Sequence, residues 1–295
     1  MRPATGGLLF IAGAYAVWGL FPVYFKALDH VDVAEVLAHR VAWTVPFAAL
    51  IVALISQWQG VRAVLVDVRQ LLLLLATALL IGINWAAYIW AIHNARILEA
   101  SLGYFMLPLT GVVLGIVLFG ERLRPWQWVA VALAVVGILQ LLLREGVLPV
   151  VGLIVAFSFG LYGALRKLAR VESAGGLFLE ALLLLPLALG WLIWIASQQT
   201  MGFVDNGLTT GLLLIGSGVI TAVPLLFYVA GARRLPLSTV GMLFYSVPTL
   251  QFLVGWLVYE EVLSGSRLLL FVCIWVGLLI HVLEGRWHER RVLAG

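Results

Sequence analysis

Cysteine and charged residues are both scarce in this sequence. Cys273 is the only cysteine, which excludes an internal disulfide and a cysteine-based metal site. Charged residues make up 11% of the chain and hydrophobic residues 63%, against about 25% and about 45–50% in an average soluble domain. The mean hydropathy is +1.10. We therefore expect an integral membrane protein whose net charge of +4 serves membrane orientation and not nucleic-acid binding.

The motifs of nucleotide-driven and hydrolytic enzymes are also missing. The sequence has no phosphate-binding G-x-x-x-x-G-K-[ST] loop, no HExxH or GxSxG motif and no pair of central aspartates. Carboxylates are nearly absent from the centres of the apolar segments, which disfavours a buried Asp/Glu relay for protons or sodium. We expect no catalytic residues, no metal and no cofactor. A lipid-acting enzyme that uses the polar cluster around His39 and His93 is the alternative from another class.

Long apolar runs predict an all-α polytopic membrane protein with ten transmembrane helices. A spanning helix needs about 20 mostly apolar residues. Breaks at charged or Gly/Pro-rich stretches place the spans near 7–28, 34–56, 70–94, 97–119, 125–143, 147–170, 176–197, 208–232, 237–259 and 266–285. Most of the 18 lysines and arginines fall on the connectors that share a side with the N-terminus. By the positive-inside rule, we expect both termini in the cytoplasm.

The two halves of the chain share a spaced pattern of uncommon residues. Aligning the chain with itself pairs Pro108 with Pro248, Gly115 with Gly255, Glu121 with Glu261, and Gly137 with Gly277. We expect two five-helix repeats, residues 1–145 and 146–295. Because five is odd, the second repeat enters the membrane in the inverted direction. Inverted repeats are typical of secondary transporters, whose halves surround a substrate site near the midplane and expose it alternately.

Pro108 and Pro248 each lie about halfway through a predicted span. Each proline removes one backbone hydrogen bond and frees the carbonyl four residues earlier, on Tyr104 and on Phe244. A packing kink is one interpretation. Their equal depth in the two halves also favours a pair of hinges that line a cavity.

Polar residues gather at the outer ends of the second, third and fourth predicted spans. The members of this outer cluster are Glu35, His39, Arg40, His93, Asn94, Arg96 and Glu99. Glu35 and His39 are separated by four positions, so they share a helix face. The cluster has three interpretations: an ion-pair network that joins the helices, an outer gate whose pairs break on opening, or proton coupling through a histidine, which titrates near neutral pH.

A second set of residues combines aromatic rings with an amide at greater depth. This aromatic set consists of Trp18, Tyr24, Asn84, Trp85, Tyr88, Tyr104, Tyr162, Tyr228 and Tyr245. Rings with a polar tip suit a pocket for small organic molecules. Each residue singly also fits interior packing or an interfacial belt. We predict that the set lines a central substrate cavity, with Tyr104 in its wall and Glu99 in the outer gate or its scaffold.

Several segments together resemble a known family. They are WGLFPVYFK, AEVLAHRVAW, INWAAYIWAIHN, LEASLGYFMLPL, GERLRPWQW, LPVVGLIVAFSFGLYGALRK and VPLLFYVAGARRLPLSTVGMLFYSVPTLQFL. Over nearly the whole chain they resemble the RarD-like proteins in the EamA branch of the drug/metabolite transporter (DMT) superfamily. Where that family has Asn-Pro-Leu after GYF, this chain has Leu107-Pro108-Leu109, so an amide is missing at the kink.

The resemblance implies ten helices in two inverted repeats and a multi-pass protein of the bacterial inner membrane. It also implies export of small organic solutes through a cavity between spans 1, 3, 4, 6, 8 and 9. Related YddG-type exporters move amino acids, and RarD-like proteins are connected with chloramphenicol sensitivity. We therefore expect an alternating-access exporter of amino acids or similar metabolites, as a monomer or dimer in the lipid bilayer. The alternative is an exporter of drugs, either chloramphenicol-type or cationic.

Overall fold

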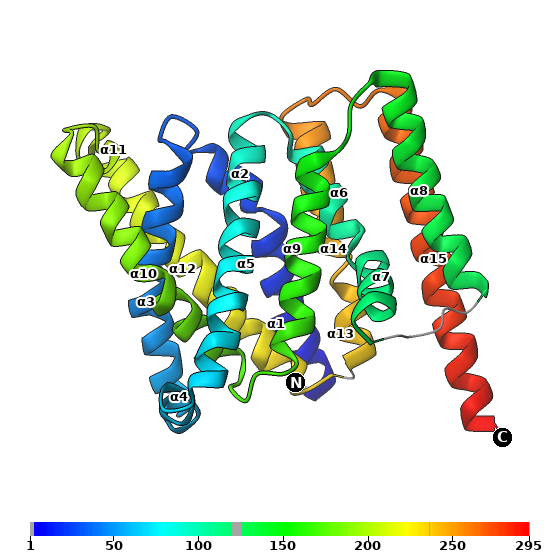
Figure 1. Cartoon of the computed structure of the whole chain (residues 1–295), viewed down its shortest axis with the longest axis horizontal. Helices are drawn as coiled ribbons and strands as arrows, with labels where there is room; N and C mark the ends of the chain where they lie inside the picture. Colours follow the sequence, from blue (N-terminus) through cyan, green and yellow to red (C-terminus); the bar gives the residue numbers. More distant parts are fainter. Residues whose placement is uncertain (1–2, 120–124, 236, 295) are drawn as a thin grey trace.

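A computed structural model describes residues 3–119, 125–235 and 237–294 (Figure 1). These residues form helices and short connections, without a strand among them. The helices are α1 (Pro3–Gly19), α2 (Phe21–Lys26), α3 (Val33–Leu54), α4 (Trp58–Leu65), α5 (Val68–His93), α6 (Ile97–Phe105), α7 (Leu107–Phe119), α8 (Pro125–Glu145), α9 (Val150–Arg166), α10 (Ser173–Ser197), α11 (Gly202–Asp205), α12 (Gly207–Ala232), α13 (Leu237–Leu243), α14 (Ser246–Leu253), the π-helical η1 (Val254–Val258) and α15 (Gly265–Ala294).

Within the described ranges, eight helical stretches are long and apolar enough to cross a membrane. They are Thr5–Lys26, Val33–Leu54, Val68–His93, Pro125–Glu145, Ser173–Ser197, Gly207–Ala232, Thr239–Val258 and Gly265–Glu284. Each falls on one of the predicted spans. The predicted fourth span is a pair of helices, α6 and α7, that meet at a bend of 47°. The predicted sixth span is α9, a shorter apolar helix of 17 residues.

Two long helices begin at aspartate caps. The Asp32 carboxylate accepts the backbone N–H groups of Ala34 and Glu35, and α3 follows. The Asp67 carboxylate likewise accepts the N–H groups of Arg69 and Gln70 at the start of α5. Such caps satisfy donors that the first helical turn leaves without a partner.

The helices break beside the two matched prolines. Met106 separates α6 from α7, and Pro108 lies in the first turn of α7. Phe244 and Tyr245 separate α13 from α14, and Pro248 lies in the first turn of α14. A proline in the first turn has no intrahelical N–H bond to lose, so a new helix can start there. Glu121, the predicted counterpart of Glu261, lies outside the described residues.

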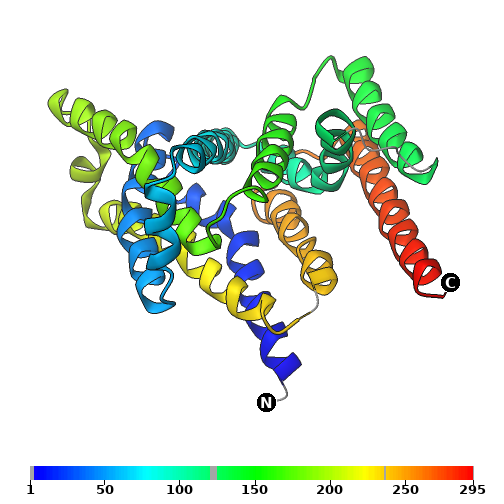
Figure 2. The same ribbon diagram turned by 60° about the horizontal axis from the view of Figure 1, so that its bottom comes forward.

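The long helices pack in pairs that join the two halves of the chain. α3 packs against α10 and α12, α1 against α12, and α5 against α9. α8 packs against α15, and both views show this pair at one edge of the molecule (Figures 1 and 2). The N-terminus and the connection between α9 and α10 lie at the same end of the bundle (Figure 1).

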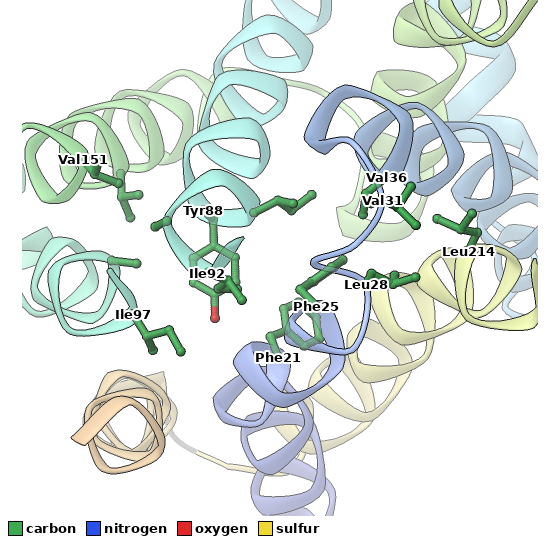
Figure 3. Packing of buried hydrophobic residues seen from close by; sticks show 14 residues of the cluster. Phe21, Phe25, Leu28, Val31, Val36, Tyr88, Ile92, Ile97, Val151 and Leu214 are labelled. Carbon is green, nitrogen blue, oxygen red and sulfur yellow. The ribbon is translucent and has the colours of Figure 1, made fainter. Parts of the chain in front are cut away.

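A hydrophobic cluster fills the opposite end of the bundle. Tyr88 and Ile92 of α5 lie close to Phe21 and Phe25 of α2 (Figure 3). The rings of Phe25 and Tyr88 meet edge to face, with centroids 6.5 Å apart. Leu28, Phe25 and Ile92 are fully buried. This packing brings α2, α5 and α6 together beside the site described next.

Candidate functional site

A cavity of about 820 Å³ lies between the helices. This volume is within the range of about 300–1,000 Å³ that is typical of small-molecule sites. Its lining comes from α1, α2, α3, α5, α6, α7 and α9, and from α10, α12, α13 and α14. The exposed side chains of Lys167 and Glu172 line its mouth, at the end of the bundle that carries the N-terminus. Tyr88 and Phe21 lie at the other end, where the hydrophobic cluster begins.

Aromatic rings from the N-terminal and C-terminal helices form one wall of the cavity. Trp18 of α1 lies 5.8 Å from Tyr15 and 5.9 Å from Tyr228 of α12, centroid to centroid. Tyr15 also meets Phe244 edge to face at 5.6 Å. The Tyr15 hydroxyl donates a hydrogen bond to the carbonyl of Val240.

A second run of rings forms the facing wall. The Tyr104 ring lies 5.8 Å from both Tyr88 and Phe159, and Phe159 lies 5.6 Å from Tyr162. These residues belong to α5, α6 and α9. Contacts of this kind favour offset or edge-to-face pairs and hold the rings in place. The cavity is therefore a preformed chamber with two runs of aromatic rings in its lining.

The buried amide of Asn84 joins three helices behind this wall. Its Nδ2 donates to the carbonyl of Val155 at 3.0 Å and to the Ser158 hydroxyl at 3.2 Å. Its Oδ1 accepts the Tyr104 hydroxyl at 3.1 Å. Asn84 is fully buried, so these bonds replace those that water would otherwise supply.

All of the predicted aromatic set except Tyr24 lines the cavity. The Tyr24 hydroxyl instead donates to the carbonyl of Leu213, which turns it toward α12. Sequence reasoning missed several lining residues: Tyr15, Phe159, Thr221, Phe244 and Gln251. Tyr15 and Phe159 each precede a predicted residue by three positions. The shared helix face was the signal that could have found them.

The structure divides the outer cluster among separate sites. Glu35 is buried and accepts the backbone N–H groups of Gly202 at 3.0 Å and Phe203 at 2.8 Å. The His39 Nε2 atom lies 3.9 Å from Glu35, and its ring stacks on Phe203 at 4.8 Å. Glu35 and His39 therefore attach α3 to α11.

Glu99 takes part in a different contact. Its Oε2 lies 3.0 Å from the Arg96 Nε, and its Oε1 accepts the N–H of Val151 at 2.8 Å. Asn94 donates to the carbonyl of Trp90. These bonds tie the hairpin between α5 and α6 to the start of α9. His93, on the last turn of α5, has a buried Nε2 without a hydrogen-bond partner.

Glu261 forms a similar contact from the second half of the chain. It accepts the backbone N–H groups of Ile97 at 2.6 Å and Leu98 at 2.8 Å, at the start of α6. Burial raises the pKa of the Glu261 carboxyl, and the two N–H donors offset part of that rise. Glu99 and Glu261 thus both hold helix starts at the end of the bundle away from the mouth.

Arg40 was predicted in the outer cluster, but its side chain lies in the cavity wall. Adjacent positions in a helix point about 100° apart, so Arg40 turns away from the face that His39 shares with Glu35. Its guanidinium lies over Trp85, 4.2 Å from the ring centroid. Its Nε donates to the Thr221 hydroxyl at 3.0 Å. The predicted pairing of Arg40 with cluster carboxylates is therefore replaced by contacts with aromatic rings and a hydroxyl.

An ion pair is buried near the mouth. The Arg166 Nε lies 3.4 Å from Glu180, whose carboxylate also accepts the hydroxyls of Thr77 and Tyr162. Among the described residues, no group of three or more His, Cys, Asp or Glu side chains could hold a metal ion.

Comparison with known proteins identifies the family of this chain. Residues 5–143 match the model of the EamA-like transporter family. An uncharacterized transporter of Vibrio cholerae is 44% identical over 96% of this chain and 94% of its own length. Protein RarD of Escherichia coli is 41% identical over 97% and 96%. The chloramphenicol-sensitive protein RarD of Pseudomonas aeruginosa is 35% identical over 99% and 97%.

A solved crystal structure has the same fold. It covers 97% of this chain and 98% of its own, with a TM-score of 0.56 at 20% identity. This likeness concerns the fold alone. The relatives and the family match show that the chain belongs to the EamA-like transporter family of the drug/metabolite transporter superfamily.

Proposed function

We propose that this protein is a secondary transporter that exports small organic solutes, amino acids or similar metabolites, from the bacterial cytoplasm by alternating access. The observation that carries the proposal is the aromatic cavity of about 820 Å³, which has its mouth at one end of the bundle. Its size and lining fit a small molecule with an apolar part. A cavity whose exposed lining residues Lys167 and Glu172 lie at one end of the bundle fits one of the two states that alternating access requires.

The helix neighbours support the proposed inverted repeats, residues 1–145 and 146–295. α1 packs against α12 and α14, and its proposed counterpart α9 packs against the matched helices α5 and α7. A Cβ atom at Gly137 of α8 would lie 2.9 Å from Leu270, and one at Gly277 of α15 would lie 3.1 Å from the carbonyl of Ala130. The two matched glycines thus both permit close contact between α8 and α15. The eight long apolar stretches, the bent pair of α6 and α7, and the shorter helix α9 together account for the proposed ten spans.

The helix breaks beside the two prolines, and two carboxylates at the end of the bundle away from the mouth, support a proposal for how that end opens. Pro108 and Pro248 are our proposed hinges, because helix breaks occur beside both. Glu99 and Glu261 are our proposed gate residues, because they fasten α9 and α6 through backbone N–H groups. We expect Glu99→Gln to alter the rate of opening more than the choice of substrate.

Counterflow in reconstituted liposomes tests the proposal. Vesicles that hold the wild-type protein and an unlabelled solute should accumulate the labelled solute, across a panel of amino acids, quaternary amines and antibiotics. Tyr104→Ala should lower the rate about tenfold, because it removes a cavity ring worth about 0.5–1.5 kcal/mol in aromatic contacts together with a hydroxyl bond. Trp194→Ala is the matched control, since Trp194 is exposed on α10 and does not line the cavity. The absence of saturable counterflow for every panel member would contradict transport.

A drug exporter is the second candidate. It is favoured by one relative, which is named a chloramphenicol-sensitive protein. Expression should then change bacterial growth on chloramphenicol or on cationic antibiotics, whereas an amino-acid exporter should change growth on toxic amino-acid analogues.

A further inference from the structure

The cavity wall contains an arginine without a counter-ion. Arg40 is 3% exposed and lines the cavity. Its Nε is bonded to Thr221, but its Nη1 is buried without a hydrogen-bond partner. No ion pair joins it to a carboxylate anywhere in the described part of the chain.

A guanidinium in this position lacks a negatively charged partner. Arginine keeps its charge in proteins, and burial of a charge without a partner is costly. The aromatic rings of Trp85, Phe25 and Phe21 lie 4.2, 5.0 and 5.5 Å from its central carbon. Cation–π contacts offset part of this cost, but the rings do not supply the hydrogen-bond acceptor that Nη1 lacks.

The nearby carboxylates of the cluster are already engaged. Glu35 accepts backbone N–H groups of Gly202 and Phe203. Glu99 binds Arg96 and the start of α9. An ionisable group deep in a membrane protein usually faces a partner or a functional cavity. Arg40 lines the cavity, so a solute that enters the cavity is the candidate for its missing partner.

We propose that Arg40 binds the carboxylate of the transported solute, and that the substrates are small organic acids with an apolar body. This assignment rests on the proposed transport function. Tyr88 supplies a second donor, because this residue also lines the cavity and its buried hydroxyl has no hydrogen-bond partner. The aromatic walls accommodate the apolar body. Amino acids belong to this class, whereas cationic drugs without a carboxylate do not.

Equilibrium binding separates this assignment from transport itself. We would titrate the full-length protein in lipid nanodiscs with phenylalanine, N-acetylphenylalanine and phenylacetate, each against its own carboxamide. At least one acid should bind about 10- to 100-fold more tightly than its amide, as expected for hydrogen bonds to a charged group. This comparison needs no variant, so it does not depend on whether a mutant folds.

Variants of Arg40 then test whether this residue causes the preference for acids over amides. Arg40→Gln should abolish the difference between acid and amide, and Arg40→Lys should keep part of it, because lysine retains the charge but loses the two-pronged geometry. Arg62→Gln is the matched control: it removes an exposed cation of α4 that does not line the cavity, so it should leave the preference unchanged.

The outcomes distinguish the two proposals. Equal binding of acids and amides, no binding of any acid, or an acid preference that survives in Arg40→Gln would overturn the role of Arg40. Counterflow of neutral or cationic solutes would still support transport in that case. Acid binding that depends on Arg40, without counterflow of any solute, would support the assignment and contradict transport.

Discussion

At the scale of single residues, the wall of the cavity depends on one buried amide. Asn84 links α5 to α9 through Val155 and Ser158, and it accepts the hydroxyl of Tyr104 on α6. Because Asn84 has no contact with solvent, any group that loses its partner there stays unsatisfied. The same amide therefore stabilises the fold and positions a ring of the cavity.

We expect Asn84→Ala to lower the free energy of unfolding by about 1–3 kcal/mol, because it leaves the Tyr104 hydroxyl without its acceptor and removes the bonds to the Val155 carbonyl and the Ser158 hydroxyl. Tyr104→Phe should cost less, about 0.5–1.5 kcal/mol, since it removes one hydroxyl and keeps the ring. Denaturation in detergent micelles would measure both variants. The double variant should be less destabilised than the sum of the two. Strict additivity would argue against the bond between Asn84 and Tyr104.

At the scale of elements, glycines set how closely α6 and α9 cross. A Cβ atom at Gly103 of α6 would lie 2.6 Å from the carbonyl oxygen of Gly152 and 2.8 Å from the Cβ of Val155. Small residues allow membrane helices to approach closely, where dispersion contacts and not the hydrophobic effect hold them together. This crossing also carries the bond from Glu99 to Val151, so the helix pair is joined by two kinds of contact.

Gly103→Ala should therefore separate the two helices and lower the free energy of unfolding by about 1–3 kcal/mol, as overpacking does. Gly111→Ala on the neighbouring α7 is the matched control, because a Cβ there meets nothing within 4 Å. Alanine is the better helix former, so Gly111→Ala should be neutral or stabilising by up to about 1 kcal/mol. Thermal unfolding in detergent micelles compares the two. Equal stability of both variants would contradict the close crossing.

At the scale of the whole molecule, the cavity mouth and the hairpin at Asn94 lie at opposite ends of the bundle. Lys167 and Glu172 line the mouth, near the N-terminus (Figure 1). The excess of lysine and arginine on that side predicts that it faces the cytoplasm. An exporter that rests in this state would load its solute from inside the cell.

Cysteine labelling tests this orientation. In a Cys273→Ser background, Asn94→Cys should react with a membrane-impermeant maleimide added to whole cells. Lys167→Cys should react only after the membrane is permeabilised. Both positions are exposed in the structure, so a difference in labelling reports the side of the membrane. The reverse pattern would place the termini and the cavity mouth outside the cell and contradict the predicted orientation.

Hydropathy was enough to locate the spans, because crossing a membrane requires a minimum length of apolar helix whatever the helix packs against. The chemistry of Trp18, Tyr104 and Tyr228 was enough to predict a cavity lining, since a set of amphipathic rings at similar depth suits a pocket for small molecules, although each ring singly also fits packing. The sequence by itself determined the membrane class, the place of the eight long apolar helices among the described residues, and most of the aromatic residues that line the cavity.

Only the tertiary structure decided where the polar side chains face. His39 and Arg40 are neighbours in sequence, yet His39 stacks on Phe203 and Arg40 lies over Trp85. A helix that is apolar nearly all round carries no stripe that reveals its rotation, so packing against α10 and α12 sets it. The same is true of Tyr24, which turns to Leu213 and away from the cavity. The rotation of each helix about its own axis therefore decides which residues line the cavity and which support it. That rotation depends on all the helices packed around it.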